Sequence, residues 1–148
     1  MKNVELQELD VSIIIVSWNT RQITCDCLRS VYEQTADVSF EVIMIDNASS
    51  DDSVDVIRNK FPEVRLIENT ENRGFAAANN QGMEIAKGRY ILLLNSDTIV
   101  LDNAISKSVA FADNQPASGI VGCRLLNADR TLQPSCFMFP SLFNMLIG

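Results

Sequence analysis

Apolar residues fall into short separate runs along this chain. Residues 11–17 are mostly β-branched and hardly alternate with polar residues, which is typical of a strand covered on both faces. Further strands are predicted at residues 40–45, 64–67, 90–94 and 119–123. Between these runs, apolar residues recur every three or four positions, which predicts amphipathic helices. The predicted helices are residues 20–32, 49–58, 74–86 and 102–114.

Strands that alternate with helices at this spacing predict an α/β fold with a mostly parallel sheet. We therefore expect a three-layer sandwich in which a Rossmann-like sheet lies between helices. Residues 127–130 are typical of a hairpin turn. Because no repeat, low-complexity segment or linker divides the chain, residues 1–148 are interpreted as one domain.

Two local expectations concern helix faces and ends. Of the two cysteines in the first helix, Cys27 is expected on the apolar side and Cys25 off it. Gly88 is expected to end the third helix. The chain has four cysteines without a C-x-x-C pair, which favours free or buried thiols in a reducing compartment over disulfides.

Charge and composition exclude several functions. The net charge is −7 and the pI is near 4.5, so the chain lacks the basic face that binds nucleic acid. The chain contains no histidine, which excludes Ser-His-Asp and Cys-His catalysis and histidine zinc sites. Residues 1–10 are polar, and no run approaches the roughly 18 apolar residues of a membrane span. We therefore expect a cytoplasmic protein.

The chemistry is predicted at the ends of the strands. The strand at residues 90–94 runs directly into Asn95, Ser96 and Asp97. Ligands of open α/β sheets bind outside the carboxyl ends of the strands. Asp97 can offer a hard oxygen there to Mg²⁺ or Mn²⁺ while a substrate diphosphate supplies further ligands. The alternative is a solvated aspartate in an ordinary turn.

Two other segments meet the same edge of the predicted sheet. Asp46 ends the second strand and is suited to accept a hydrogen bond from the ring N–H of a pyrimidine base. The alternative is a cap for the helix that follows. Gly74 allows close approach of the backbone to a ligand, and Arg73 adds a fork of donors for phosphate. The free N–H groups at the start of the third helix favour an anion. The alternative for this alanine-rich helix is packing alone.

Taken together, four motifs resemble a known family. They are the segments 11–19 (VSIIIVSWN), 45–51 (IDNASSD), 71–80 (ENRGFAAANN) and 92–97 (LLLNSD). In this order they resemble the family 2 inverting glycosyltransferases with the GT-A fold, in particular rhamnosyltransferase-like bacterial enzymes of cell-surface polysaccharide synthesis. The resemblance implies a nucleotide-diphosphate sugar donor, a carbohydrate or lipid-linked acceptor, and a divalent metal.

The resemblance also implies roles for individual residues. The residues implied in nucleotide-sugar binding are Ser17, Trp18, Asn19, Asp46, Asn47, Arg73, Gly74, Asn79, Asn95 and Ser96. Within this set, Asp46 would contact the base, and Arg73 and the Gly74 turn would hold the base, ribose or diphosphate. Asn95 to Asp97 would form the family's Asp-x-Asp element, with Asp97 on the metal and ribose.

The sequence departs from the family pattern at two points. Asn95 stands where the family has the first aspartate of its Asp-x-Asp element, which removes one charge. No carboxylate after Asp97 is a convincing catalytic base, because Asp102 is interpreted as a helix cap, Asp113 as helix surface and Asp129 as a turn residue. The base is therefore expected beyond Gly148, and this chain would be an N-terminal portion lacking the acceptor half.

The apolar segment at residues 137–147 supports the same interpretation, because an exposed patch of this kind invites association. We expect it to pack on the sheet or between copies of the chain, and we expect the full-length enzyme to associate with the inner face of the membrane. The main rival is a module that binds a nucleotide sugar without transferring it. A dinucleotide oxidoreductase or a sugar-nucleotide pyrophosphorylase would require a glycine-rich loop after the first strand, and this sequence has no such loop there.

Overall fold

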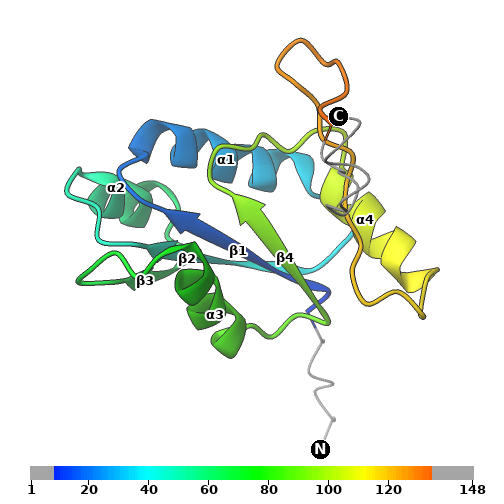
Figure 1. Ribbon diagram of the computed structural model, residues 1–148, viewed down its shortest axis with the longest axis horizontal. Coiled ribbons are helices and arrows are strands. Elements are labelled where there is room, and N and C mark those ends of the chain that lie inside the picture. Colours follow the sequence, from blue (N-terminus) through cyan, green and yellow to red (C-terminus); the bar gives the residue numbers. More distant parts are fainter. Residues whose placement is uncertain (1–8, 135–148) are drawn as a thin grey trace, which may run out of the picture. The chain divides into compact units, whose positions relative to one another are not determined.

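Figure 1 shows the computed structural model of the chain, which describes residues 9–134. The sheet has four parallel strands in the order β3-β2-β1-β4. The strands are β1 (Val11–Ser17), β2 (Phe40–Asp46), β3 (Arg65–Glu68) and β4 (Tyr90–Asn95). The helices are α1 (Arg21–Gln34), α2 (Ser53–Lys60), α3 (Phe75–Ile85) and α4 (Ala104–Asp113). The predicted α/β fold with a parallel sheet is confirmed.

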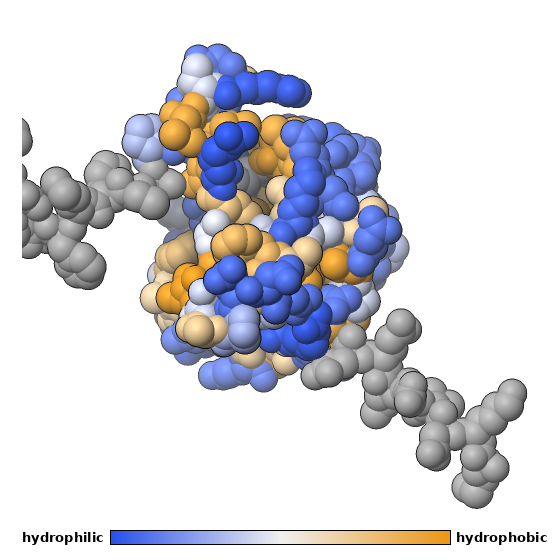
Figure 2. Space-filling view, turned by 90° about the vertical axis from the view of Figure 1, so that its right-hand side faces the viewer, coloured by the Kyte–Doolittle hydropathy of each residue, from blue (hydrophilic) through white to orange (hydrophobic). Residues whose placement is uncertain are grey.

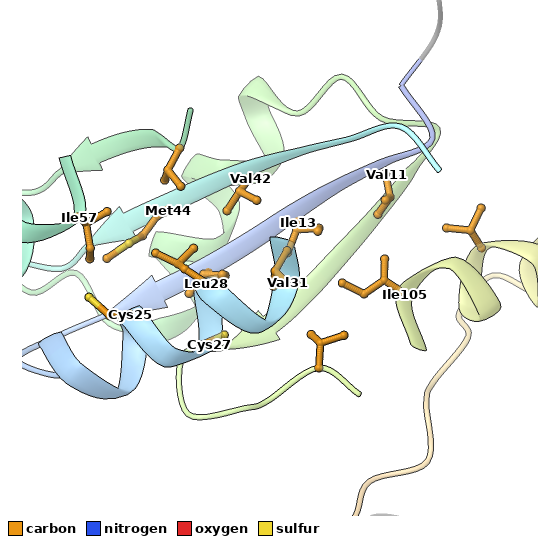
Figure 3. Close-up of a cluster of buried hydrophobic side chains, with 14 residues drawn as sticks. Val11, Ile13, Cys25, Cys27, Leu28, Val31, Val42, Met44, Ile57 and Ile105 are labelled. Carbon is orange, nitrogen blue, oxygen red and sulfur yellow. The ribbon is translucent and has the colours of Figure 1, made fainter. Parts of the chain in front are cut away.

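The sheet buries a core on each of its faces. Successive residues of a strand point to opposite faces, so Ile13 and Ile15 join one cluster with side chains of α1, α2 and α4. Figure 3 shows this cluster, in which Leu28 and Val31 of α1 lie over β1 and β2. Ile14 points the other way and packs in a smaller cluster under α3. Helices therefore cover both faces, as expected of a three-layer arrangement.

Cys25 corrects the predicted face of α1. The side chain is buried, and it belongs to the same core cluster as Cys27. The reason is that α1 contacts α2 as well as the sheet, so its buried face is wider than one apolar stripe. Among the described residues, Cys25, Cys27 and the exposed Cys123 form no disulfide.

Two expected helix boundaries also differ from the structure. α3 ends at Ile85, so Gly88 does not close it. Gly88 instead lies against β1, where an added Cβ would come within 2.4 Å of the backbone nitrogen of Ser12. Asp102 does not cap α4, because Asn103 occupies the cap position without a side-chain hydrogen bond to the helix. Both differences depend on contacts between elements far apart in the sequence.

β4 is an edge strand in the described part of the chain, and one of its faces is uncovered. Ile91 is 46% exposed and Leu93 is 48% exposed, whereas Leu92 and Leu94 pack against the larger core cluster. α3 packs on β1 and β2, and it leaves the same face of β4 open. Figure 2 shows hydrophobic side chains reaching the surface between hydrophilic ones. None of the described helices is both long enough and apolar enough to cross a membrane.

Contacts divide the chain into two units, Met1–Ser118 and Gly119–Gly148. The second unit lacks the strand predicted at residues 119–123, and Ile120 there is 95% exposed. The predicted turn at residues 127–130 is confirmed, because Leu126 and Leu132 form an antiparallel bridge and the Asn127 amide donates to the Thr131 carbonyl. The apolar segment 137–147 lies outside the described residues.

Candidate functional site

The register of the sheet brings three polar strand ends to one edge. Ser17 at the end of β1 lies opposite Asp46 at the end of β2. On the other side of β1, Val16 lies opposite Asn95 at the end of β4. Neighbouring strands are separated by about 4.8 Å, so Asp46 and the turn after β4 are about 10 Å apart across β1. The arrowheads of β1 and β4 in Figure 1 mark this edge.

The turn after β1 is locked to the turn after β2. Asn19 adopts a left-handed conformation with φ 53°. Its backbone amide donates to Ser49 Oγ at 2.8 Å, and its Oδ1 accepts a hydrogen bond from the Ser50 amide at 2.8 Å. The buried Ser17 hydroxyl is bonded to the hydroxyls of Thr20 and Thr24, both at 2.9 Å. The Trp18 ring, by contrast, is 54% exposed at this edge.

Asp46 is a buried carboxylate whose two oxygens differ. Its Oδ2 accepts a hydrogen bond from the Ser49 backbone amide at 2.9 Å. Its Oδ1 is buried and has no hydrogen-bond partner among residues 9–134. A buried carboxylate oxygen without a donor is costly, so this atom is suited to a donor brought by a ligand or by a rearranged loop.

The segment from Asn69 to Gly74 is tied to β2 through Asn47, whose side chain is 3% exposed. Asn47 Oδ1 accepts from the Arg73 backbone amide at 3.0 Å and from Asn69 Nδ2 at 3.2 Å. Asn47 Nδ2 donates to Asn72 Oδ1 at 2.8 Å. Neither Asn69 nor Asn72 is among the residues implied in donor binding, although Asn72 lies within the motif at residues 71–80.

Gly74 is the N-cap residue before α3 and has a φ of 79°, a conformation that favours glycine. The neighbouring Arg73 is exposed, and its side chain forms no ion pair or hydrogen bond within the described part of the chain. Asn79 is buried, and its Nδ2 donates to the Phe75 carbonyl at 2.9 Å. Arg73 is thus available to a ligand, whereas the Asn79 amide is engaged within the helix.

The turn after β4 is held by α1. The carbonyl of Asn95 accepts from the Thr98 amide at 3.2 Å and from Cys27 Sγ at 3.6 Å. Burial raises the pKa of the Cys27 thiol to about 11, so the thiol stays protonated and can donate. Farther along, Ser30 Oγ accepts from the Val100 amide at 2.9 Å.

Asp97 carries the only carboxylate of this turn, and its exposed side chain has no partner among the described residues. Those residues contain no group of three or more acidic, cysteine or histidine side chains that could enclose a metal by themselves. Mg²⁺ is commonly held by one or two carboxylates together with substrate phosphates. The residues therefore fit only a metal that arrives with further ligands such as phosphate oxygens, to which Asp97 would offer one carboxylate.

A shallow hollow adjoins this edge at the N-terminal ends of α1 and α2. It is lined by Asn19, Thr20, Arg21, Gln22, Ile23, Asp51 and Asp52. Arg21 already pairs with Asp52 at 2.8 Å, so the cation of the hollow is neutralised. Neither Asp46 nor Asp97 lines it. The strand-end groups, rather than this hollow, are therefore the candidate site.

The family of the chain follows from comparison with known proteins. Residues 12–134 match the profile described as Glycosyl transferase family 2. This match covers well over half of the chain, so the chain belongs to that family. The α/β fold likewise corresponds to GT-A transferase structures.

Curated relatives share this region. The "UDP-Glc:alpha-D-GlcNAc-diphosphoundecaprenol beta-1,3-glucosyltransferase WfaP" of Escherichia coli is 36% identical over 107 residues, which cover 71% of this chain and 42% of WfaP. The "Poly(ribitol-phosphate) beta-glucosyltransferase" of Bacillus spizizenii is 34% identical over 113 residues, which cover 72% of this chain and 18% of the relative. The chain thus spans less than half of the length of either relative.

Solved structures show the same fold. The mannosyltransferase PcManGT from Pyrobaculum calidifontis, in complex with GDP-Man and Mn²⁺, matches with a TM-score of 0.64 and 25% identity, covering 72% of this chain and 33% of that chain. S. aureus TarS 1-349 in complex with UDP-GlcNAc matches with a TM-score of 0.63 and 22% identity, covering 73% of this chain and 32% of that chain.

Proposed function

We propose that the protein transfers a sugar from a nucleotide-diphosphate sugar to an acceptor hydroxyl, with inversion, in bacterial cell-surface polysaccharide synthesis. The observation that carries the proposal is the set of unpaired groups on one sheet edge. The Arg73 guanidinium and the Asp97 carboxylate have no partners among the described residues, and neither does the buried Oδ1 of Asp46. Together they offer a cation for phosphate, a metal ligand and an acceptor for a base N–H.

In the proposed reaction the acceptor oxygen forms a bond to the anomeric carbon while the bond from that carbon to the diphosphate oxygen breaks. A bound Mg²⁺ or Mn²⁺ would neutralise charge on the departing diphosphate. Asp97 would hold this ion, Arg73 would bind phosphate oxygens, and Trp18 and Asp46 would bind the nucleoside. The remaining site residues of the resemblance stay predictions for donor binding; they are Ser17, Asn19, Asn47, Gly74, Asn79, Asn95 and Ser96.

We propose that the catalytic base, which takes the proton of the acceptor hydroxyl, lies outside this chain. Of the carboxylates after Asp97, Asp113 is bonded to Arg89 and Tyr90, and Asp129 is bonded to Thr131. General-base assistance contributes about 10²–10⁴-fold to rate. Residues 1–148 should then bind the donor but transfer almost nothing, which is the behaviour of a binding module. Transfer at rates typical of an enzyme would identify Asp102 or Asp129 as the base.

The experiment that tests the donor class is binding against UDP-, GDP- and dTDP-sugars, each with and without Mn²⁺. The panel should include a rhamnosyl donor, because the rhamnosyltransferase-like branch is part of the proposal. We expect one nucleotide to bind tightly and Mn²⁺ to strengthen that binding. Absence of binding to every member of the panel would contradict the proposed function.

The proposed acceptor is a carbohydrate or a lipid-linked sugar, and the full-length protein is proposed to meet it at the inner face of the membrane. Support comes from the name of the relative WfaP, which gives a diphosphoundecaprenol-linked sugar as its acceptor. Transfer by the full-length protein to a lipid-linked acceptor, but not to water alone, is the expected outcome.

A further inference from the structure

A group of side-chain amides at the end of β2 holds the loop that precedes α3. We call the side chains of Asn47, Asn69, Asn72 and Gln81 the amide clasp. Asn69 and Gln81 exchange two hydrogen bonds of 2.9 Å, and Asn69 also donates to Asn47 Oδ1. Asn72 Oδ1 accepts both from Asn47 Nδ2 and from the Gly74 backbone amide at 2.9 Å. The clasp therefore joins β2, the loop and α3.

Two backbone donors fix the orientation of these amides. The Arg73 N–H can only donate, so the Asn47 atom that it meets must be the oxygen. The Gly74 N–H likewise requires the Asn72 oxygen, which leaves Asn47 Nδ2 as the donor between the two side chains. The carbonyl oxygen of Asn47 thus already accepts two hydrogen bonds. Both polar atoms of the Asn47 side chain are thus engaged, and the side chain is buried, so it is poorly placed to contact a ligand directly.

The clasp bears on the site through Arg73. Asn47 directly follows Asp46 in the sequence, and it is hydrogen-bonded to the backbone of Arg73. The side chain of Arg73 is exposed and has no partner among residues 9–134. A flexible arginine in an unanchored loop would lose conformational entropy on binding phosphate, and anchoring its backbone lowers that cost.

We propose that Asn47 is a positioning residue of the donor site, which acts through the amide clasp to place Arg73 for binding the donor diphosphate. The proposal deepens the proposed function and rests on it. It assigns to Asn47 an indirect role in place of the direct ligand contact implied by the family resemblance. It also brings Asn69, Asn72 and Gln81 into the donor site as supports of the Arg73 loop.

The test begins with hydrogen exchange without ligand. In Asn47→Ala the amides of Arg73 and Gly74 should exchange about fivefold faster or more. The substitution removes the acceptor of the Arg73 amide, and it also removes the donor that holds Asn72, which is the acceptor of the Gly74 amide. Amides of β1 and β2 should keep their exchange rates. Asn59→Ala, on the exposed surface of α2, is the matched control and should change nothing. Asn72→Ala, at an exposed position, serves as a second variant should Asn47→Ala fail to fold, and it removes the acceptor of the Gly74 amide. Unchanged exchange at Gly74 in Asn72→Ala would overturn the clasp.

The second measurement is binding of UDP, GDP and dTDP beside the corresponding nucleosides. For the diphosphate that the unaltered chain binds best, Asn47→Ala should weaken affinity about tenfold, whereas affinity for the matched nucleoside should change less than about twofold. In an Arg73→Ala background, Asn47→Ala should cause no further loss. Equal losses for diphosphate and nucleoside, or losses that add in the double variant, would overturn positioning through Arg73. If the unaltered chain binds no diphosphate, the proposed function fails, whereas the exchange experiment still reports on the clasp.

Discussion

At the scale of single residues, Asp46 and Asp97 occupy similar places at strand ends but differ in their surroundings. Asp97 is exposed and unpartnered in the described part of the chain, so its charge is free to meet a cation. Asp46 is buried, with one oxygen on the Ser49 amide and the other without a donor. These surroundings suit the roles proposed above, a metal ligand for Asp97 and an acceptor for a base N–H for Asp46.

Replacing Asp97 tests the metal site. Asp97→Asn should abolish the dependence of nucleotide-diphosphate binding on Mn²⁺, because the only carboxylate of the turn becomes a neutral amide. The fold should stay intact, since the side chain makes no contact that the fold needs. Titration calorimetry with and without Mn²⁺ measures the effect. Glu84→Gln on the exposed face of α3 removes the same charge and should change nothing. Metal-dependent affinity that persists in Asp97→Asn would contradict the assignment.

Replacing Asp46 separates a base contact from a helix cap. In Asp46→Asn the amide oxygen can still accept from Ser49, but the other atom becomes a donor where a base N–H needs an acceptor. We expect nucleotide affinity to fall about tenfold or more, because hydrogen bonds to charged groups contribute about 1.5–3 kcal/mol. The thermal midpoint should hardly change.

Asp46→Ala should in addition lose about 0.5–2 kcal/mol of stability, as caps do. Asp51→Asn, which alters the neighbouring acceptor of the Ser53 amide, should leave affinity unchanged. A loss of stability in Asp46→Ala without loss of affinity would show that Asp46 is only a cap.

At the scale of elements, the contact between α3 and the sheet is unusually close. A Cβ added at Gly82 would meet Ile14 Cγ2 at 2.7 Å and Ile45 Cδ1 at 3.0 Å. The N-terminal end of α3 lies beside Arg73, and α3 also contains Gln81 of the amide clasp. The distance between α3 and the sheet therefore sets where the Arg73 loop lies.

Gly82→Ala should push α3 away from β1 and β2. We expect a loss of about 1–3 kcal/mol in the free energy of unfolding, which is usual for an overpacked core. Denaturant unfolding measures the loss. Gly122→Ala is the control, because a Cβ there would meet nothing within 4 Å. Equal stability of the two variants would show that α3 can shift at no cost.

At the scale of the whole molecule, the two faces of the sheet are covered unequally in the described residues. α1, α2 and α4 contribute to the larger core cluster, whereas α3 alone covers the other face, where it packs mainly on β1 and β2 and also bonds to β3 through Arg65. Ile14 and Leu93 are register partners on this second face. Ile14 is fully buried, and Leu93 is 48% exposed.

This asymmetry predicts different costs for equal truncations. Ile14→Ala should destabilise the chain by about 2–5 kcal/mol, as buried large-to-small substitutions do. Leu93→Ala should cost under about 1 kcal/mol, because the side chain already contacts solvent. Thermal or denaturant unfolding of both variants measures the difference. A similar cost at the two positions in this chain would mean that the β4 face is covered in solution.

The sequence by itself determined the strand and helix order, because buried parallel strands and amphipathic helices each leave their own spacing of apolar residues. It also placed Asp46, Arg73 and Asp97 at strand and helix ends, where polar residues interrupt apolar runs. It failed at residues 119–123, whose apolar composition resembles a strand although they pair with no strand in the structure. An apolar run predicts burial only if a partner strand is available.

Tertiary structure alone decided which polar residues are engaged and which are free. Asn47 and Arg73 both looked like ligand residues in the sequence, but one is buried in the amide clasp and the other is exposed. The burial of Cys25 and the role of Gly88 were likewise set by neighbouring elements. A side chain's hydrogen-bond partners come from segments distant in sequence, here residues 22 to 26 positions apart. Local pattern cannot specify these pairings, because they depend on how the elements pack.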